Sequence, residues 1–425
     1  MHPSPGRDTL FPRTRPVVPL SLPLALIRRA AMADFLVNTT KSGDQFQPAV
    51  DALFGTQFLE LWSDESDFVI KGQFLGDDGD KLGDEFAVSS QPSDGPGVRP
   101  LWPSVLSAGI SGQFAVWLET PFGTPGPSPS VKLQRFTEGR KSGPETLVTA
   151  DADPKVRPCL AFMIDGGVLV TWASLRPDQR IRARRFHADG SAATPEFTVS
   201  TTEGFHEKPA ASILTNGNVV VAWSTDPSAI GGGRLTLRFF DFEGNPLGGE
   251  IQPNVGGFTG VNAITLLDNG RFVVAHIEGI QPSDLGKPQT TIAASIFQPD
   301  GTETFDITAG NPRGVTRSSP SLSRLPGGRF LMAWVEESAD THDTVPTVMA
   351  KVCSESQGSL GDPVRVSTAD PGRRSHTCTA TAFGNGPESV IVTWDDDSHL
   401  DGDTGFGVRA RTFHVSPPGM LVEAS

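Results

Sequence analysis

The chain repeats one pattern of apolar and polar positions, and the copy from Pro209 to Trp223 shows it most clearly. An alternating apolar stretch leads into an Asn-Gly turn, and a dense β-branched run then ends at the tryptophan. The same spacing recurs from Pro48 to Trp62, Pro103 to Trp117, Pro158 to Trp172 and Pro320 to Trp334, and in two degenerate copies from Asn262 to His276 and from Ala380 to Trp394. Seven copies at a period of roughly 50 to 60 residues indicate a repeat architecture.

Each copy predicts four antiparallel strands. The Asn-Gly turn between two apolar runs is a strong hairpin signal, because both central residues of a type I′ turn need positive φ. The second strand, Val219–Ala222, is apolar on both faces and must be covered on both sides. A third strand ends at an aromatic residue such as Phe240, and a fourth follows, as at Glu250-Ile251. The sequence therefore predicts an all-β fold, a seven-bladed β-propeller of four-stranded antiparallel blades.

The propeller is expected to span residues 34–415. Its blades run at about 41–88, 89–149, 150–200, 201–254, 255–308, 309–367 and 368–415. Residues 34–40 resemble the fourth strand and turn at 196–202, but no other strands of a blade precede them. We therefore predict that this N-terminal strand completes the seventh blade and closes the ring, which removes the exposed edges of an open array. Leu421-Val422, in the C-terminal tail 416–425, is the rival for that place.

Residues 1–33 lie outside the repeats and are rich in proline and arginine. We expect a disordered N-terminal extension or a signal-like segment there. A signal peptide would make the protein extracellular, whereas a start at Met32 would make it cytoplasmic, and the sequence leaves both open. No apolar run reaches the roughly 20 residues of a transmembrane helix, so no membrane span is expected.

Composition narrows the possible partners. The net charge of -14 disfavours binding to nucleic acid and to anionic membranes. The chain has no tyrosine, which excludes the tyrosine nucleophile of the common sialidase mechanism. Its 3 cysteines give no disulfide framework, and no Cys or His spacing resembles a zinc site. Candidate chemistry must therefore come from residues that the fold brings together.

The composite repeat resembles a known family. It reads Pro-x-x-x-x-Leu, a turn with Gly, Phe-Val-Val-x-Trp, Arg-Phe-x-x-x-Gly and Gly-x-Glu-Phe-x-Val-Asn-Thr. This pattern is similar to a repeat of bacterial surface and secreted proteins that often lies beside RTX or cadherin-like modules, and the resemblance covers about 34–415. It implies a β-propeller, a shape shared with seven-bladed bacterial and fungal lectins. The matching residues are core and turn positions, so the resemblance implies no binding residue.

Cations recur in the connections that lead from the fourth strand of one blade to the innermost strand of the next. Such connections meet near the axis of a propeller, so we predict a ring of positive charge there. This ring would favour an anionic ligand, such as an acidic sugar, a sulfated glycan, a phosphate or an acidic peptide. The alternative is a solvated rim that offsets the acidic loops. The candidate residues are Arg99, Lys155, Arg157, Lys208, Arg317, Arg373 and Arg374, with His206 and His376.

Trp102 is the only tryptophan outside the repeated position. It directly precedes Pro103, at a place where other repeats have Gln47, Arg157, Lys208 or Ser319. An aromatic side chain there is expected either to stack on a sugar or to pack against a neighbouring blade. Trp102 therefore joins the candidate ligand-binding residues.

The densest acidic loop holds Asp395, Asp397, Asp401 and Asp403. Several carboxylates around a glycine turn supply the oxygen ligands that Ca²⁺ prefers. Asp-Gly turns are also ordinary hairpin chemistry, which is the alternative interpretation. Calcium is the one cofactor that the sequence suggests.

Three functions fit these observations. The first is non-catalytic recognition of a glycan or other anionic ligand on the axial face, and it is our main hypothesis because no nucleophile and base form a familiar motif. The second is a protein–protein interaction scaffold that uses the acidic outer loops. The third is a hydrolase or lyase with an axial active site. The segments between the tryptophan and the third strand vary in length, so we expect them to contribute to binding.

Overall fold

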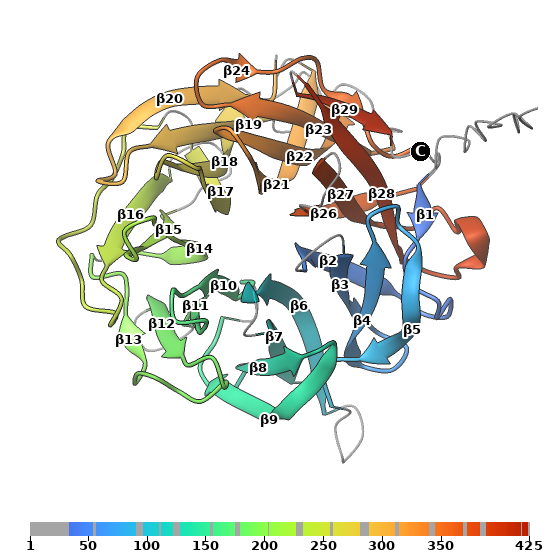
Figure 1. The fold of residues 1–425 in the computed structure, drawn as a ribbon, viewed down its shortest axis with the longest axis horizontal. Helices are drawn as coiled ribbons and strands as arrows, with labels where there is room; N and C mark the ends of the chain where they lie inside the picture. The colour runs from blue at the N-terminus through green and yellow to red at the C-terminus, as the bar shows by residue number, and fades with distance from the viewer. Residues whose placement is uncertain are drawn as a thin grey trace, which may run out of the picture.

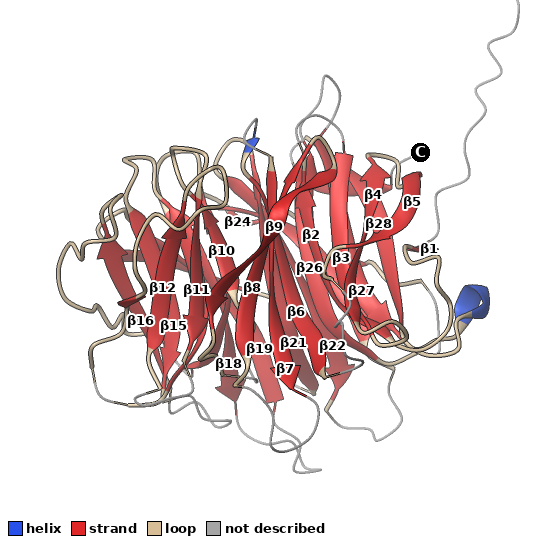
Figure 2. Ribbon diagram, turned by 90° about the horizontal axis from the view of Figure 1, so that it is seen from below, coloured by secondary structure: helices blue, strands red, loops and turns tan. Residues whose placement is uncertain are grey.

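The computed structural model describes residues 34–53, 57–90, 97–109, 112–121, 128–153, 156–174, 179–202, 204–226, 233–255, 258–280, 289–310, 314–339, 345–368, 372–382, 388–417 and 419–423. Their strands form seven antiparallel sheets arranged around one axis (Figure 1), which confirms the predicted seven-bladed propeller. Seen from the side, the strands run between two faces formed by loops (Figure 2). The signal-like segment 1–33 lies outside the described residues.

The first four blades follow one another along the chain. Blade 1 holds β2 (Gln45–Ala52), β3 (Gln57–Asp64), β4 (Val69–Gly76) and β5 (Lys81–Ala87), and blade 2 holds β6 (Val98–Ser107), β7 (Gln113–Pro121), β8 (Ser130–Thr137) and β9 (Arg140–Thr149). Blade 3 holds β10 (Cys159–Phe162), β11 (Val168–Ala173), β12 (Ile181–Phe186) and β13 (Phe197–Thr198), and blade 4 holds β14 (His206–Ile213), β15 (Val219–Thr225) and β16 (Arg234–Phe240). In blade 4 the outer edge of β16 forms only isolated bridges, to Pro246 and Ile251.

The remaining three blades complete the ring. Blade 5 holds β17 (Phe258–Leu266), β18 (Phe272–Ile280), β19 (Gln289–Phe297) and β20 (Glu303–Thr308), and blade 6 holds β21 (Val315–Leu325), β22 (Arg329–Ser338), β23 (Thr347–Ser354), β24 (Gly358–Ser359) and β25 (Val364–Arg365). Blade 7 holds β26 (Arg374–Ala382), β27 (Glu388–Asp396), β28 (Gly407–Ser416), β1 (Phe35–Leu36) and β29 (Met420–Glu423). Each innermost strand contacts the innermost strand of the next blade, and β26 of blade 7 contacts β2 of blade 1.

The hydrophobic core lies in the layers between neighbouring blades. Most of these layers bury a tryptophan from a second strand, which explains why that residue ends each repeat: Trp62, Trp117, Trp172, Trp223, Trp334 and Trp394. Between blades 4 and 5 the position belongs to His276, which is fully buried, with Nε2 2.9 Å from Ser295 Oγ. Burial lowers the pKa of His276 to about 4, so this ring is neutral at neutral pH.

Both chain ends complete blade 7. Phe35 and Leu36 of β1 pair with Ala410 and Arg409 near the start of β28, which confirms the predicted closure by the N-terminal strand. The rival segment also pairs, because β29 occupies the other end of the same edge, from Phe413 to Ser416. The expected C-terminal tail is therefore partly a strand.

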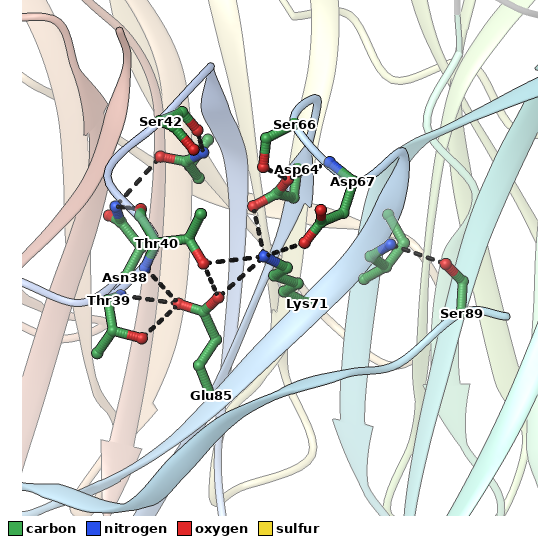
Figure 3. Close-up of polar contacts among 12 residues, drawn as sticks. Asn38, Thr39, Thr40, Ser42, Asp64, Ser66, Asp67, Lys71, Glu85 and Ser89 are labelled. Carbon is green, nitrogen blue, oxygen red and sulfur yellow. Dashed lines mark hydrogen bonds and ion pairs between the residues drawn. The ribbon is translucent and has the colours of Figure 1, made fainter. Parts of the chain in front are cut away.

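A polar cluster fastens the closing segment to blade 1 (Figure 3). Glu85 of β5 accepts hydrogen bonds from the backbone amides of Thr39 and Thr40, at 2.7 and 3.2 Å, and from the Thr40 hydroxyl at 2.6 Å. Lys71 lies 3.1 Å from Glu85 and also pairs with Asp64 at 3.1 Å. Blade 1 thus holds in place the segment that follows β1, the N-terminal strand of blade 7.

One assignment of the repeat pattern needs correction. In blade 1 the residue after the proline, Ala49, pairs with Leu61, and in blade 7 the equivalent pair is Cys378 with Thr393. Thr377, rather than Ala380, therefore occupies the proline position. The first hairpin of blade 7 is three residues longer than that of blade 1, since 393 − 378 is 15 and 61 − 49 is 12. Counting residues back from Trp394 could not reveal this insertion.

Candidate functional site

A cavity of about 1280 Å³ runs along the propeller axis, and the innermost strands of all seven blades line it. Its wall contains many small or apolar side chains, among them Ala49, Leu160, Ala211 and Ile264. Ligand sites in proteins commonly have volumes of roughly 300 to 1,000 Å³ and are mostly apolar with a few converging polar groups. The axial cavity is larger than this range, and its wall combines apolar side chains with serine, threonine and charged side chains, so it has room for a ligand and polar groups to bind one.

A β-bulge near the start of the inner strand supplies the polar groups. The residue just before the repeated proline is the extra one in the pairing with the second strand, and the register shifts there in blades 1, 2, 4 and 6. In those blades it has positive φ: Gln47 (58°), Trp102 (54°), Lys208 (54°) and Ser319 (50°). Non-glycine residues with such φ carry strain of about 1 kcal/mol or more each, and strain of this kind is concentrated at functional sites.

The bulge position brings several predicted residues together at the cavity. Arg157 occupies it in blade 3, two residues before Cys159, the first paired residue of β10. His376 occupies it in blade 7, where the register shifts between Arg374 and Thr377. Trp102, Arg157, Lys208 and His376 all line the cavity, and Ser319 joins them. These four members of the predicted set therefore share one site, although they come from four different blades.

At the bulge position a hydrogen-bond network links blades 7, 1 and 2. The fully buried Asp395 lies 2.6 Å from Nδ1 of His376 and accepts a 3.1 Å hydrogen bond from the backbone amide of Gln47. The Gln47 side chain in turn accepts a 2.7 Å hydrogen bond from the amide of Trp102. The rings of Trp102 and His376 meet edge to face, with centroids 5.0 Å apart and an angle of 81°. Trp102 thus contacts His376 across blade 1, and it also packs against the core between blades 2 and 3.

Two cations of the predicted set, Lys208 and Arg157, face the same cavity, and Arg324 lines it as well. The Lys208 side chain is 43% exposed, and its Nζ lies 3.7 Å from the carboxylate of the neighbouring Glu207. Its Nζ lies beside Gly260 of blade 5, where an added Cβ would come within 3.0 Å of it, so glycine leaves room for the lysine. Arg157 lines the cavity from blade 3, and its charge favours the ionised form of Glu60 in blade 1.

Two carboxyl groups in or near the cavity wall have raised pKa values. Burial raises the pKa of Asp51 to about 6, against the hydrogen bond that its carboxylate accepts from the Ser107 amide. Burial also raises the pKa of Glu60 well above its usual range, against a hydrogen bond from Thr393 and the charge of Arg157. Asp51 lines the cavity, whereas Glu60 lies on the face of β3 that packs against blade 7. Among the lining residues that the structure describes, Asp51 is the only carboxylic acid.

The other predicted cations have partners away from the cavity lining. Arg99 pairs with Glu65 and lies over the ring of Phe46. Arg317 pairs with Glu336 at 2.6 Å, and Arg374 pairs with Asp396 at 2.9 Å. The exposed Arg373 lies 2.7 Å from Asp397. Only Arg373 lies in a connection as predicted, because Arg99, Arg317 and Arg374 belong to the innermost strands β6, β21 and β26. All four have ion-pair partners and are outside the set that lines the cavity.

His206 and Lys155 complete the list of predicted residues. His206 is buried, accepts a 3.2 Å hydrogen bond from Trp223 Nε1 and has Nε2 2.9 Å from the Thr202 carbonyl. It supports the core and is not part of the cavity wall. Lys155 lies outside the described residues, as do most of the variable segments between the tryptophan and the third strand.

The acidic loop of blade 7 does not gather its carboxylates. Asp395 binds His376, Asp397 pairs with Arg373, and Asp401 lies 3.0 Å from Arg409. Asp403 accepts a 3.3 Å hydrogen bond from Asn38. In the part of the chain that the structure describes, no group of three or more His, Cys, Asp or Glu side chains is placed to hold a metal ion. Calcium at this loop stays a prediction.

Sequence reasoning missed Gln47, Ser319, Asp51 and Glu60. The residue before the proline was a usable signal for Gln47 and Ser319, since the same position supplied Trp102 and Lys208. Asp51 and Glu60 had no such signal, because a single acidic residue in a strand looks the same whether it is exposed or faces the axis.

Several solved structures share this fold at low sequence identity. A lectin, BP39L from Burkholderia pseudomallei, matches with a TM-score of 0.56 and 13% identity over 89% of this chain and 98% of the lectin. An ulvan lyase bound to -[GlcA(1-4)Rha3S]- matches with a TM-score of 0.51 and 10% identity, over 92% of this chain and 96% of the lyase. A protein of unknown function from Dyadobacter fermentans matches with a TM-score of 0.50 and 15% identity, over 74% of this chain and 95% of that protein.

These likenesses establish the class of fold, a seven-bladed β-propeller, and nothing finer. No protein-family model matches the chain, and no curated protein is significantly similar to it. The resemblance to repeats of bacterial surface proteins therefore remains a prediction, although a lectin is among the structural neighbours. Among the described residues, no helix has the length and hydrophobicity of a transmembrane segment.

Proposed function

We propose that the axial cavity binds a carbohydrate that carries acidic groups. The observation that supports this most directly is the convergence of Trp102, Arg157, Lys208 and His376 on one cavity. A tryptophan ring offers a sugar an apolar face, and arginine and lysine bind carboxylate or sulfate groups through charge-assisted hydrogen bonds. The strain at the bulge position fits a site whose side chains are held ready for a ligand.

The neighbours add support of a general kind. One is a lectin and another is a lyase whose structure contains a bound saccharide, so the fold is compatible with carbohydrate ligands. The sequence identities of 10% and 13% are too low to carry over any residue or substrate.

The test is binding of acidic and neutral polysaccharides by affinity electrophoresis, followed by titration calorimetry with oligosaccharides of any polymer that binds. The double variant Arg157→Ala and Lys208→Ala should weaken binding of an acidic oligosaccharide by about 100-fold, since each charged hydrogen bond contributes roughly 1.5 to 3 kcal/mol. The matched control removes two exposed arginines outside the cavity lining, Arg140→Ala and Arg234→Ala, and should leave affinity unchanged. Equal affinities for both double variants would contradict the proposal.

A second candidate function is an enzyme acting on a carbohydrate at the same place. The contact between buried Asp395 and His376 favours it, because a carboxylate that holds Nδ1 of a histidine orients the ring for proton transfer. Binding and catalysis are separated by following the bound polysaccharide over time: a recognition module leaves its chain length unchanged, whereas an enzyme shortens it.

A further inference from the structure

The cavity holds the parts of a proton-transfer site. Asp395 is fully buried, and its Oδ2 lies 2.6 Å from His376 Nδ1, while Oδ1 accepts a 3.1 Å hydrogen bond from the His376 amide. A carboxylate that accepts from Nδ1–H selects the neutral tautomer whose lone pair is on Nε2. The His376 side chain is 28% exposed and lines the cavity, so the edge of the ring away from Asp395 is the part that a ligand can reach.

The position of His376 is held from several sides. Asp395 is also bound by the Gln47 amide, and the ring of Trp102 packs edge to face against the imidazole. A base that is fixed by hydrogen bonds and packing needs little reorganisation when a substrate arrives. His376 differs in this respect from His206, which is buried at 1% exposure and does not line the cavity.

The acids and cations in the cavity discriminate between two reaction types. Hydrolysis of glycosides commonly uses two carboxyl groups on either side of the scissile bond. Among the described lining residues only Asp51 is acidic, and it lies four residues beyond Gln47 on β2, or roughly 13 Å along an extended strand. Elimination from a uronate instead needs one base and a cation that stabilises charge on the sugar carboxylate.

We propose that His376 catalyses β-elimination in a polysaccharide that contains uronic acid, with Arg157 or Lys208 binding the uronate carboxylate. This inference rests on the proposed binding of an acidic carbohydrate in the cavity. Nε2 of His376 takes the proton from C5 of the uronate, and the electrons of that C–H bond form the C4=C5 double bond as the C4–O4 bond breaks. The protonated imidazole then returns the proton to the departing bridging oxygen. The products are a 4,5-unsaturated uronate and a new reducing end, and neither water nor an oxidant is consumed.

Each residue has a defined part in this reaction. His376 is the catalytic base and then the acid, and the cation that binds the carboxylate stabilises the negative charge that builds up when the C5 proton leaves. Asp395 is a positioning residue, because it acts on the substrate only through His376. Trp102 supplies an apolar face beside the base for the sugar ring.

The experiment starts with affinity electrophoresis of the full chain in gels that contain polygalacturonate, alginate, heparan sulfate or ulvan. Every polymer that retards the protein is then incubated with it, and unsaturated products are followed by their ultraviolet absorbance and by the vinyl proton signal in NMR spectra. We expect unsaturated ends to appear in step with new reducing ends. His376→Ala should lower kcat by at least about 100-fold while polymer binding persists, as expected for loss of a general base.

Two further variants complete the design. His187→Ala removes an exposed histidine on a hairpin turn and should retain full activity. Asp395→Asn should lower kcat with little change in KM, because it misorients the base without touching the substrate; circular dichroism and thermal melting verify that each variant is folded. Comparable losses of activity in His187→Ala and His376→Ala would overturn the assignment of the base.

The outcomes separate this inference from the proposed function. Binding without cleavage would overturn the elimination and leave carbohydrate recognition in place. Cleavage that yields reducing ends without unsaturation would show hydrolysis and also overturn it. Retardation by none of the acidic polymers would overturn both proposals.

Discussion

The contact between Glu85 and the N-terminal segment predicts how acid opens the ring. Glu85 accepts hydrogen bonds from Thr39 and Thr40 and pairs with Lys71, and only 8% of its side chain is exposed (Figure 3). Burial alone would raise the pKa of Glu85, but the hydrogen bonds from Thr40 and Thr39 and the contact with Lys71 outweigh it and hold the pKa at about 2. The ionised carboxylate therefore stabilises the closed ring.

The perturbation is Glu85→Gln, which keeps the size of the side chain. Glutamine has one acceptor oxygen, so its amide group must face either the amides of residues 39 and 40 or the ammonium of Lys71, and both are donors. The pKa falls from 4.5 to about 2, and each pKa unit corresponds to about 1.4 kcal/mol, which gives roughly 3 kcal/mol at most. The cluster lies near the surface, where solvent screens charges, so we expect a loss of about 2 kcal/mol at pH 7.

The pH dependence has a definite sign. The folded pKa of Glu85 is below the unfolded value, so its contribution is present above about pH 4.5 and disappears as the pH falls towards 2. Denaturant titrations at pH 7 and pH 3, followed by tryptophan fluorescence, should therefore show a smaller difference between wild type and Glu85→Gln at the lower pH. Hydrogen exchange of the Val37 amide, which donates to the Val408 carbonyl at 2.7 Å, should accelerate in the variant.

Blade 4 offers a matched control. Glu250 accepts hydrogen bonds from Thr201 and Thr202 of the preceding blade in the same manner as Glu85, but it pairs with no lysine of the described residues and closes no seam. Glu250→Gln should lower stability by less than about 1 kcal/mol, because an exposed charged contact contributes little. Equal losses in the two variants, or a loss in Glu85→Gln that does not change between pH 7 and pH 3, would refute this account of the ring seam.

Three other changes test the core and the turns. Asp51→Asn should raise the melting temperature at pH 8 and change it little at pH 4, because a carboxyl whose folded pKa is raised to about 6 loses its stabilising contribution as the pH rises through 6. The wild type should lose stability between pH 7 and pH 4, because burial lowers the pKa of His276 to about 4 and the folded ring resists protonation. His276→Gln should lose less stability over this range, as measured by calorimetric melts. Gly112→Ala should destabilise by more than about 2 kcal/mol because its Cβ would lie 2.1 Å from the Phe136 carbonyl, whereas Gly217→Ala, which has open space, should cost about 1 kcal/mol for its positive φ alone. Equal denaturation midpoints for the two alanine variants would count against the close contact.

The number of blades followed from the sequence because the pattern behind it is local. A hairpin turn, a strand that is apolar on both faces and a tryptophan at its end all lie within 15 residues, as from Pro209 to Trp223, and each has a physical cause that does not depend on the rest of the chain. Ring closure was also predictable, since residues 34–40 have the pattern of a fourth strand without a blade. The local pattern failed at Ala380, where an insertion in the hairpin moved the proline position to Thr377.

The sequence predicted only some of the residues that form the axial site. A cation in a connecting segment looks the same whether it faces the cavity or an acidic neighbour, and the choice depends on partners that are distant in sequence. Arg317 pairs with Glu336 and Arg373 with Asp397, whereas Arg157 and Lys208 occupy the bulge position and line the cavity.

Periodicity along the chain specified the repeats, their strands and the buried tryptophans, because those features depend on neighbours within one blade or one turn. Only the closed ring placed Trp102 of blade 2 against His376 of blade 7, with Gln47 of blade 1 between them. Residues separated by more than 270 positions meet there because the seven inner strands converge on a common axis, and no local signal records that distance.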